Sequence, residues 1–143
     1  MKENMSKEET LAYMAGIIDG EGSITISFQQ EKRGYKPLYC RLTISNISKD
    51  LIELLKANFG GSIMLRTRKG NRKIMWDWAI SGRNVKDCLI KEIPFLLVKK
   101  QQADIALRFL NISLGRKVPY HNGMREQLLS LREQLMVLNK RGI

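Results

Sequence analysis

Two carboxylates, Asp19 and Glu21, stand among glycines in the stretch LAYMAGIIDGEGSITIS, residues 11–27. Gly20 and Gly22 leave the backbone bare on either side of Glu21, so a phosphate or a second subunit can approach closely. A carboxylate in such a place can bind a hard divalent cation such as Mg²⁺, which takes oxygen ligands and keeps several waters. One carboxylate per chain supplies too few ligands for a metal site by itself. A twofold axis would bring two copies of Glu21 together, and backbone carbonyls and phosphate oxygens would then complete the coordination.

A stripe of small residues lies along the helix expected to carry these acids. Leu11, Met14 and Ile18 fall on another side and can face the core. A glycine inside a helix lowers the stability of the helix by about 1 kcal/mol relative to alanine, so the presence of Gly16 calls for a structural reason. A close helix–helix seam between two copies supplies one, and the alternative is an accidental small stripe on a solvent-facing side. The predicted interface residues, spaced i, i+3, i+4 and i+7, are Ala12, Ala15, Gly16 and Asp19.

The length and charge of the chain limit the class of protein. Its 143 residues, 43% of them hydrophobic, are enough for one domain spanning residues 1–143. The net charge is +11, which indicates a polyanionic partner. Residues 1–30 carry two lysines and five acids, whereas residues 61–100 carry ten Lys/Arg and three acids. Such a basic block is more typical of nucleic-acid binding than of a merely cationic protein, which remains the alternative.

Neither cysteine belongs to a CxxC pair, and Cys40 lies inside an apolar alternation, so we expect a buried free thiol there. The N-terminal region lacks the apolar segment of a signal peptide, and no segment reaches the roughly 18 apolar residues that a membrane span needs. We therefore expect an intracellular protein, in the cytoplasm or an organelle, with no membrane partner. His121, the sole histidine, lies beside a Pro–Tyr turn and is interpreted as structural or surface.

Local patterns predict the elements that position the two acids. SKEE, residues 6–9, has the form of a capping box, so a helix should run over residues 7–19 and stop at Gly20. Residues 23–29 and 38–45 alternate apolar and polar, which is typical of half-buried strands. The side chains expected to face inward are Ile24, Ile26 and Phe28, and then Cys40, Leu42 and Ile44.

The same reading continues to the end of the chain. We expect a helix over residues 48–58, a hairpin turning at residues 70–71, and a third helix from residue 84 to near Pro94. Ile74, Trp76, Trp78 and Ile80 are expected to face inward. Residues 99–115 and 122–142 predict two further amphipathic helices. The fold class is therefore α+β, an antiparallel sheet with helices on one face and a polar, basic face on the other.

The polar face of the sheet suits the major groove of a duplex. It concentrates arginine and hydroxyl side chains with few acids, and such side chains can bond to base edges. A merely solvated sheet face is the alternative explanation.

The segment MAGIIDGEG, residues 14–22, resembles the LAGLIDADG motif of the homing endonucleases. Five positions match letter for letter, and Glu21 keeps the carboxylate of the motif. The order of the predicted elements also resembles the αββαββα core of this family, in which the sheet is saddle-shaped, with C-terminal helices added. One motif per chain is the pattern of the homodimeric members. The five identical residues are Ala15, Gly16, Ile18, Asp19 and Gly22.

The resemblance implies roles for the residues around the motif. Glu21, assisted by the Gly20 carbonyl, would bind the catalytic metal, and Asp19 would serve the helix end and the interface. The basic residue after PFL sits in the cleavage pocket of the family, which favours Lys99 over Lys100.

Three more residues are candidates for the same pocket. A polar residue at the end of the second strand helps to order water in the family, and Asn46 or Ser45 can fill that place. Lys49 is a further basic candidate. The resemblance also places the outward residues of the four strands in the major groove, here Thr25, Ser27, Gln29, Glu31, Tyr39, Arg41, Thr43, Arg66, Arg68, Lys73, Met75 and Asp77.

The activity implied is site-specific cleavage of double-stranded DNA by a homodimer on a long, nearly palindromic target. Mg²⁺ would be the cofactor, Mn²⁺ could substitute, and Ca²⁺ would bind without supporting efficient cleavage. The alternatives are an RNA maturase that assists intron splicing, and a catalytically inactive DNA-binding regulator. Whether the last helix packs on its own domain or supports the DNA stays open.

Overall fold

The computed structural model describes residues 5–31, 33–68, 71–115 and 122–140. The side chains of Arg68 and Lys73, and all of His121, lie outside the described part. The elements in chain order are α1 Lys7–Glu21, β1 Gly22–Phe28, β2 Leu38–Asn46, α2 Lys49–Phe59, β3 Ser62–Arg68, β4 Asn71–Ser81, α3 Arg83–Glu92, a 3-10 turn Ile93–Phe95, α4 Lys100–Ser113 and α5 Asn122–Lys140. This order confirms the predicted α+β fold with an αββαββα core and added C-terminal helices.

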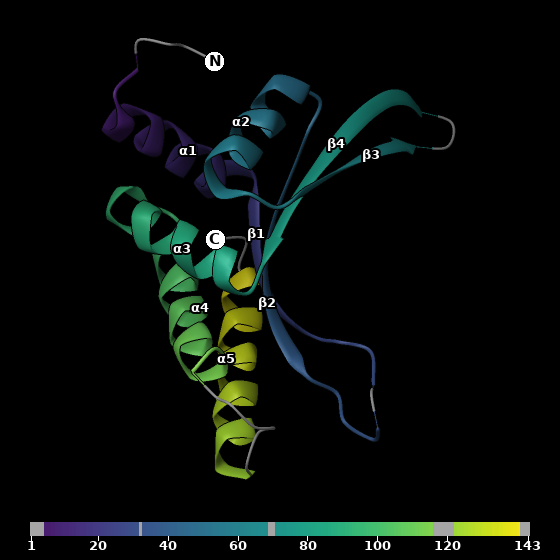
Figure 1. The fold of residues 1–143 in the computed structure, drawn as a ribbon, viewed down its shortest axis with the longest axis vertical. Coiled ribbons are helices and arrows are strands. Elements are labelled where there is room, and N and C mark those ends of the chain that lie inside the picture. Colours follow the sequence, from purple (N-terminus) through teal and green to yellow (C-terminus); the bar gives the residue numbers. More distant parts are fainter. Residues whose placement is uncertain (1–4, 32, 69–70, 116–121, 141–143) are drawn as a thin grey trace.

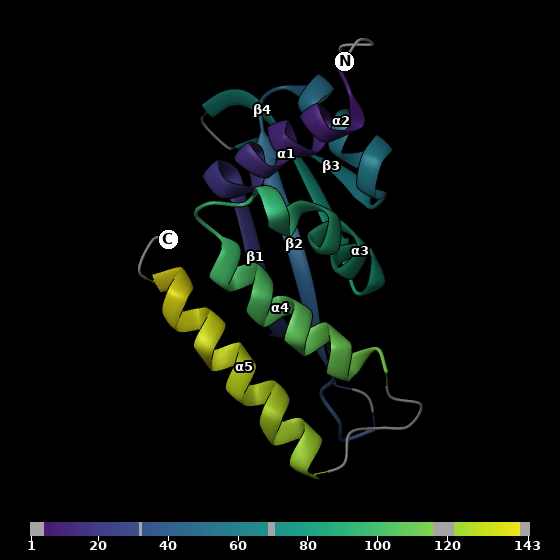
Figure 2. The same ribbon diagram turned by 90° about the vertical axis from the view of Figure 1, so that its left-hand side faces the viewer.

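The four strands form one antiparallel sheet in the order β1-β2-β4-β3. The helices cover one face of it, and the hairpins β1–β2 and β3–β4 extend as two arms that curve toward the open side (Figure 1). Figure 2, seen from the helical side, shows α1, α3, α4 and α5 in front of the strands. We call the open side the concave face.

The core forms where the apolar side of each strand meets the helices. On β2, Cys40, Leu42 and Ile44 are at most 1% exposed, as the alternation predicts. Cys40 and Cys88 are both buried free thiols, and burial raises the pKa of Cys40 to about 12. Trp78 on β4 is fully buried, and its indole N–H donates to the Gly60 carbonyl at 2.8 Å.

The outer arm of β3–β4 departs from the prediction. Ile74, expected to face the core, is 50% exposed, and Leu65 on the paired strand is 51% exposed. Trp76 is half-buried, with the Lys49 ammonium 5.1 Å from the ring centroid. The ribbon extends past the helix α2 that would cover it (Figure 1), so the alternation continues where no core exists.

Helix α1 ends two residues later than predicted. Its capping box forms, because Glu9 N–H donates to Ser6 Oγ and Ser6 N–H donates to the Glu9 carboxylate. Gly20 stays helical, and the helix ends at Glu21 with Gly22 as its cap. A Cβ at Gly22 would lie 2.7 Å from the carbonyl oxygen of Ile18, so the turn into β1 requires glycine there.

Helix α5 packs on its own domain, against α4 and β1. Leu128 and Leu135 are at most 1% exposed, and the Asn139 amide donates to the Ile24 carbonyl at 3.0 Å. Among the described helices, none has the length and apolar character to cross a membrane.

Glu92 at the end of α3 generates a prediction about stability. Its side chain has no exposed surface, and within the described residues neither carboxyl oxygen has a hydrogen-bond partner. Burial raises the pKa of Glu92 from 4.5 to about 8, while the neighbouring Cys88 thiol stays protonated because its own pKa is also raised. Between pH 4.5 and about pH 8, Glu92 is therefore ionised in the unfolded chain and protonated in the folded chain. The free energy of unfolding therefore falls as the pH rises through this range, by up to about 1.4 kcal/mol per pH unit.

We expect Glu92→Gln, which cannot ionise, to gain stability over the wild type between pH 5 and pH 8. Urea unfolding of both proteins at these two pH values measures the difference. A difference that does not change with pH would contradict the expected ionisation of Glu92.

Candidate functional site

The candidate site lies at the C-terminal end of α1. Glu21 is the last residue of the helix and is exposed, and the last turn contains no basic residue. The C-terminal end of a helix carries partial negative charge, so a carboxylate there adds to an existing negative potential. This end of α1 therefore favours the binding of a cation.

Asn46, the last residue of β2, holds the Glu21 side chain. The pairing of Gly22 with Ile44 brings the end of β2 beside the end of α1. The Asn46 Nδ2 donates to both carboxylate oxygens of Glu21, at 3.1 and 2.9 Å. Its Oδ1 accepts from the backbone N–H of Ser48 at 2.8 Å, which fixes the direction of the amide. Asn46 therefore orients Glu21 from a rigid strand end.

Asp19 points elsewhere, because residues two apart on a helix differ by about 200° around its axis. Its carboxylate accepts from the backbone N–H groups of Leu97 at 2.8 Å and Lys99 at 2.9 Å. Lys99 is the cap of α4 and has no side-chain capping bond of its own. Asp19 thus connects the start of α4 to the end of α1, and both of its carboxylate oxygens are engaged in these hydrogen bonds.

The same contact brings a cation to the helix end. The half-buried Lys99 donates from Nζ to the Asp19 carbonyl at 2.9 Å. Lys100, the first residue of α4, is exposed. The end of α1 thereby carries two separate sets of contacts, Glu21 with Asn46 and Asp19 with Lys99.

Two other pocket candidates have different partners. Lys49 lies 3.7 Å from Glu53 in an exposed i, i+4 ion pair and stands over the Trp76 ring. Ser45 donates from Oγ to Asp77 at 2.5 Å. Adjacent residues of a strand point to opposite sides, so Ser45 belongs to the concave face while Asn46 reaches Glu21.

The metal-binding capacity of one chain is incomplete. Within the described ranges, no three His, Cys, Asp or Glu side chains gather to hold an ion. Glu21 and the Gly20 carbonyl offer hard oxygen ligands, which suit Mg²⁺ or Ca²⁺. Further oxygen donors would come from water, a partner chain or a bound phosphate.

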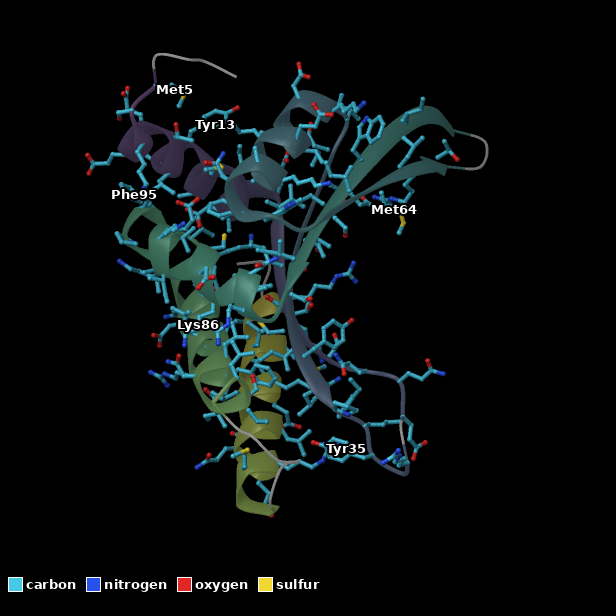
Figure 3. The ribbon with its side chains drawn as sticks, in the orientation of Figure 1. Met5, Tyr13, Tyr35, Met64, Lys86 and Phe95 are labelled. Carbon is cyan, nitrogen blue, oxygen red and sulfur yellow. The ribbon has the colours of Figure 1, made fainter. Side chains whose placement is uncertain are left out.

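The concave face carries most of the residues predicted to contact DNA. Strand pairing sets Thr25 opposite Arg41, Ser27 opposite Tyr39, and Arg66 opposite Met75. The prediction that Gln29 and Glu31 lie on a strand is wrong, because β1 ends at Phe28 and both residues lie in the following loop. Figure 3 shows Met64 projecting from β3 on this side. Alternation also assigns further residues to this face that were not singled out from the sequence, namely Ser23, Ser62, Met64 and Ser81.

An ion pair lies in the centre of this face. Arg66 Nε is 3.0 Å from Asp77 Oδ2, and Arg66 Nη2 donates to Asp77 Oδ1 at 3.2 Å. Among the described strand residues of the concave face, Asp77 is the only acid. It orients Arg66 and, with the Ser45 contact, links three strands.

The exposed side of α1 presents small residues and apolar neighbours. Ala12, Gly16 and Gly20 are exposed, and an added Cβ at either glycine would meet nothing within 4 Å. Next to the helix end, Leu97 is 89% exposed and Val98 48%.

The predicted interface needs a correction at Ala15, which has no exposed surface. Ala15 follows Leu11 by four residues, so it shares the buried side of the helix rather than the small stripe.

The chain is similar to known proteins in both sequence and fold. Residues 14–103, more than half of the chain, match the model of the LAGLIDADG endonuclease family. Among curated proteins none matches this chain.

Three solved structures share the fold. The homing endonuclease I-CvuI, in complex with its target in the presence of calcium, is 20% identical over 92% of this chain and 82% of its own, with a TM-score of 0.75. The archaeal intron-encoded I-Vdi141I, complexed with DNA, is 20% identical over 93% and 86%, with a TM-score of 0.77. I-LtrWI, bound to target DNA, is 15% identical over 94% of this chain but 45% of its own, with a TM-score of 0.71. The chain belongs to the LAGLIDADG endonuclease family.

Proposed function

We propose that this protein is a site-specific endonuclease that cuts double-stranded DNA as a homodimer, with a divalent cation at Glu21. The observation that carries the proposal is the exposed Glu21 carboxylate, held by Asn46 at the negative end of α1. A side chain needed only for folding would not require such orientation at an exposed helix end.

The residues of the chain divide the chemical work. Glu21 and the Gly20 carbonyl would hold Mg²⁺, which when bound neutralises charge at the phosphate and lowers the pKa of an attacking water. Asn46 keeps the carboxylate in place. Lys99 supplies positive charge near the reacting phosphate, where developing negative charge needs stabilisation.

A homodimer accounts for the two glycines on the exposed side of α1. Neither Gly16 nor Gly20 is required by contacts within the chain, since each leaves open space beside its Cα. A second copy packed along Ala12, Gly16 and Gly20 would use that space and cover Leu97. The chain also aligns with less than half of I-LtrWI. Two copies of this chain would match the extent of that longer protein.

The concave face suits a long target. The nine residues of β2 extend about 30 Å at about 3.3 Å per residue. Two such faces related by a twofold axis would cover about 60 Å of duplex, which is about 18 base pairs at 3.4 Å each. A symmetric dimer would read the two halves as inverted repeats, hence a nearly palindromic site.

The decisive change is Glu21→Gln, which removes the charge that holds the cation and keeps the shape of the side chain. We expect cleavage to fall on the order of 10³-fold or more while DNA affinity is kept. The target is first selected from a randomised duplex pool in Ca²⁺ and then given Mg²⁺, and cut ends are sequenced. Selection matters because I-CvuI, in complex with the I-CreI target and Mg²⁺, left that DNA uncleaved.

Glu8→Gln is the matched control, since it removes the same charge from the other end of α1. Cleavage by Glu21→Gln at the wild-type rate would contradict the metal-binding role. Selection of a duplex that the wild type never cuts would favour the inactive DNA-binding regulator, and enrichment of no duplex at all would favour the RNA maturase.

Asn46→Ala tests the orientation of Glu21. Loss of the two hydrogen bonds should lower cleavage by about 10- to 100-fold, as is usual when the group supporting a metal ligand is removed. Single-turnover cleavage is measured at increasing Mg²⁺, and partial rescue at high Mg²⁺ is expected. An unchanged rate would show that Glu21 does not depend on Asn46.

Gly16→Leu tests the dimer. The open space beside Gly16 allows the single chain to accept the larger side chain, and a helix gains about 1 kcal/mol when glycine is replaced. We expect a stable monomer in sedimentation that no longer cuts DNA. Ala57→Leu, on the exposed side of α2, is the control and should stay dimeric. A dimeric Gly16→Leu variant would contradict the proposed seam.

A further inference from the structure

The loop between β1 and β2, residues 29–37, is contacted by Arg125 of α5, and Arg132 of the same helix contacts Phe28 at the end of β1. The structure describes residues 29–31 and 33–37 of this loop. Its exposed side chains include Gln29, Glu31 and Lys36, which are of kinds that bond to bases or phosphates. The loop ends the lower arm of the concave face (Figure 1).

Arg125 makes three contacts with this arm. Its guanidinium carbon lies 5.9 Å from the ring centroid of Phe28 and 5.5 Å from that of Tyr35. Its Nη1 donates to the Lys36 carbonyl at 3.0 Å. Arg132, two turns further along α5, lies 4.7 Å from the ring centroid of Phe28. In Figure 3, the Tyr35 side chain lies on the side of the loop that faces α5.

These contacts supply what the loop lacks by itself. Phe28 ends β1 and is 39% exposed, so it is not anchored in the core. Beyond it the chain turns through Arg33 and Gly34, both with positive φ. A planar guanidinium between two rings, with a hydrogen bond to the backbone, fixes both sides of the loop at once.

We propose that Arg125 is a specificity-positioning residue, which fixes the β1–β2 loop for base recognition in the outer part of each half-site. This inference rests on the proposed function as a DNA-binding nuclease. Arg125 lies on the helical side and acts through the loop rather than by touching DNA.

The position of the loop limits which base pairs are affected. The seven residues of β1 separate it from Glu21 by about 23 Å, or about seven base pairs along the duplex. Base pairs near the cleavage point would instead be read by strand residues such as Thr43 and Arg66. Loss of Arg125 should therefore spare central positions and relax the outer ones.

Arg125 is a suitable residue to change, because the packing of α5 depends on other side chains. Leu128, Leu131 and Leu135 are buried, whereas Arg125 is partly exposed. Arg108 on α4 provides a matched control. It pairs with Asp104 at 3.0 Å, and its removal costs the same single charge.

The test compares Arg125→Gln, Arg125→Lys and Arg108→Gln with the wild type. Each protein selects duplexes from a randomised pool in Ca²⁺, and the base preference at every position is read from the bound DNA. For Arg125→Gln we expect discrimination at the outer positions to fall about tenfold, with central preferences unchanged. Discrimination by Arg125→Lys at the outer positions should lie between that of the wild type and that of Arg125→Gln, because lysine keeps the charge but loses the planar contact. Arg108→Gln should keep the wild-type profile.

Hydrogen exchange of the free proteins supplies a second readout. Amides of residues 29–37 should exchange faster in Arg125→Gln, and those of α5 should not. Preferences weakened equally at all positions, or unchanged at the outer ones, would overturn the proposal. A wild type that binds selected DNA without cutting it would refute the nuclease function alone, since preference is read from binding. A wild type that selects no duplex would overturn both proposals.

Discussion

The turn from α1 into β1 is the constraint on which the site depends. The helix ends at Glu21 and the strand begins at the next residue, Gly22, without a connecting loop. The chain can leave the helix this abruptly because glycine avoids the contact that a Cβ would make with Ile18. With no flexible residue between them, the carboxylate of Glu21 is fixed relative to the sheet. Ordinary strand pairing then brings Asn46 beside it.

The two acids of the motif serve different ends because the helix turns them apart. Asp19 meets the N-terminal end of α4, where free backbone N–H groups and the positive end of the helix dipole favour a carboxylate. Glu21 stays at the negative end of α1, where the Asn46 amide donates to both of its carboxylate oxygens. One helix end thus provides both an anchor for the next layer and an exposed carboxylate.

The extent to which the sequence predicts this structure follows the range of the interactions. The capping box at Ser6 and the alternation of Cys40, Leu42 and Ile44 are local, and both are confirmed. The exposure of Ile74 depends on where α2 ends in space, which alternation does not encode. Which of Ser45 and Asn46 meets Glu21 depends on how the end of β2 lies beside α1. The contacts of Arg125 join residues about 90 positions apart, with no local pattern to indicate them.

The ion pair between Arg66 and Asp77 affects how the protein responds to salt. Charge-driven affinity for DNA arises when bound lysines and arginines displace condensed counterions, with a slope of about −0.9 per phosphate neutralised. Arg66 already has its counterion within the protein, so its approach to the duplex releases little or none. The count of 25 lysines and arginines therefore overstates the electrostatic part of binding, whereas the net charge of +11 already sets Asp77 against Arg66. Rising ionic strength would weaken the complex with DNA less steeply than the number of lysines and arginines suggests.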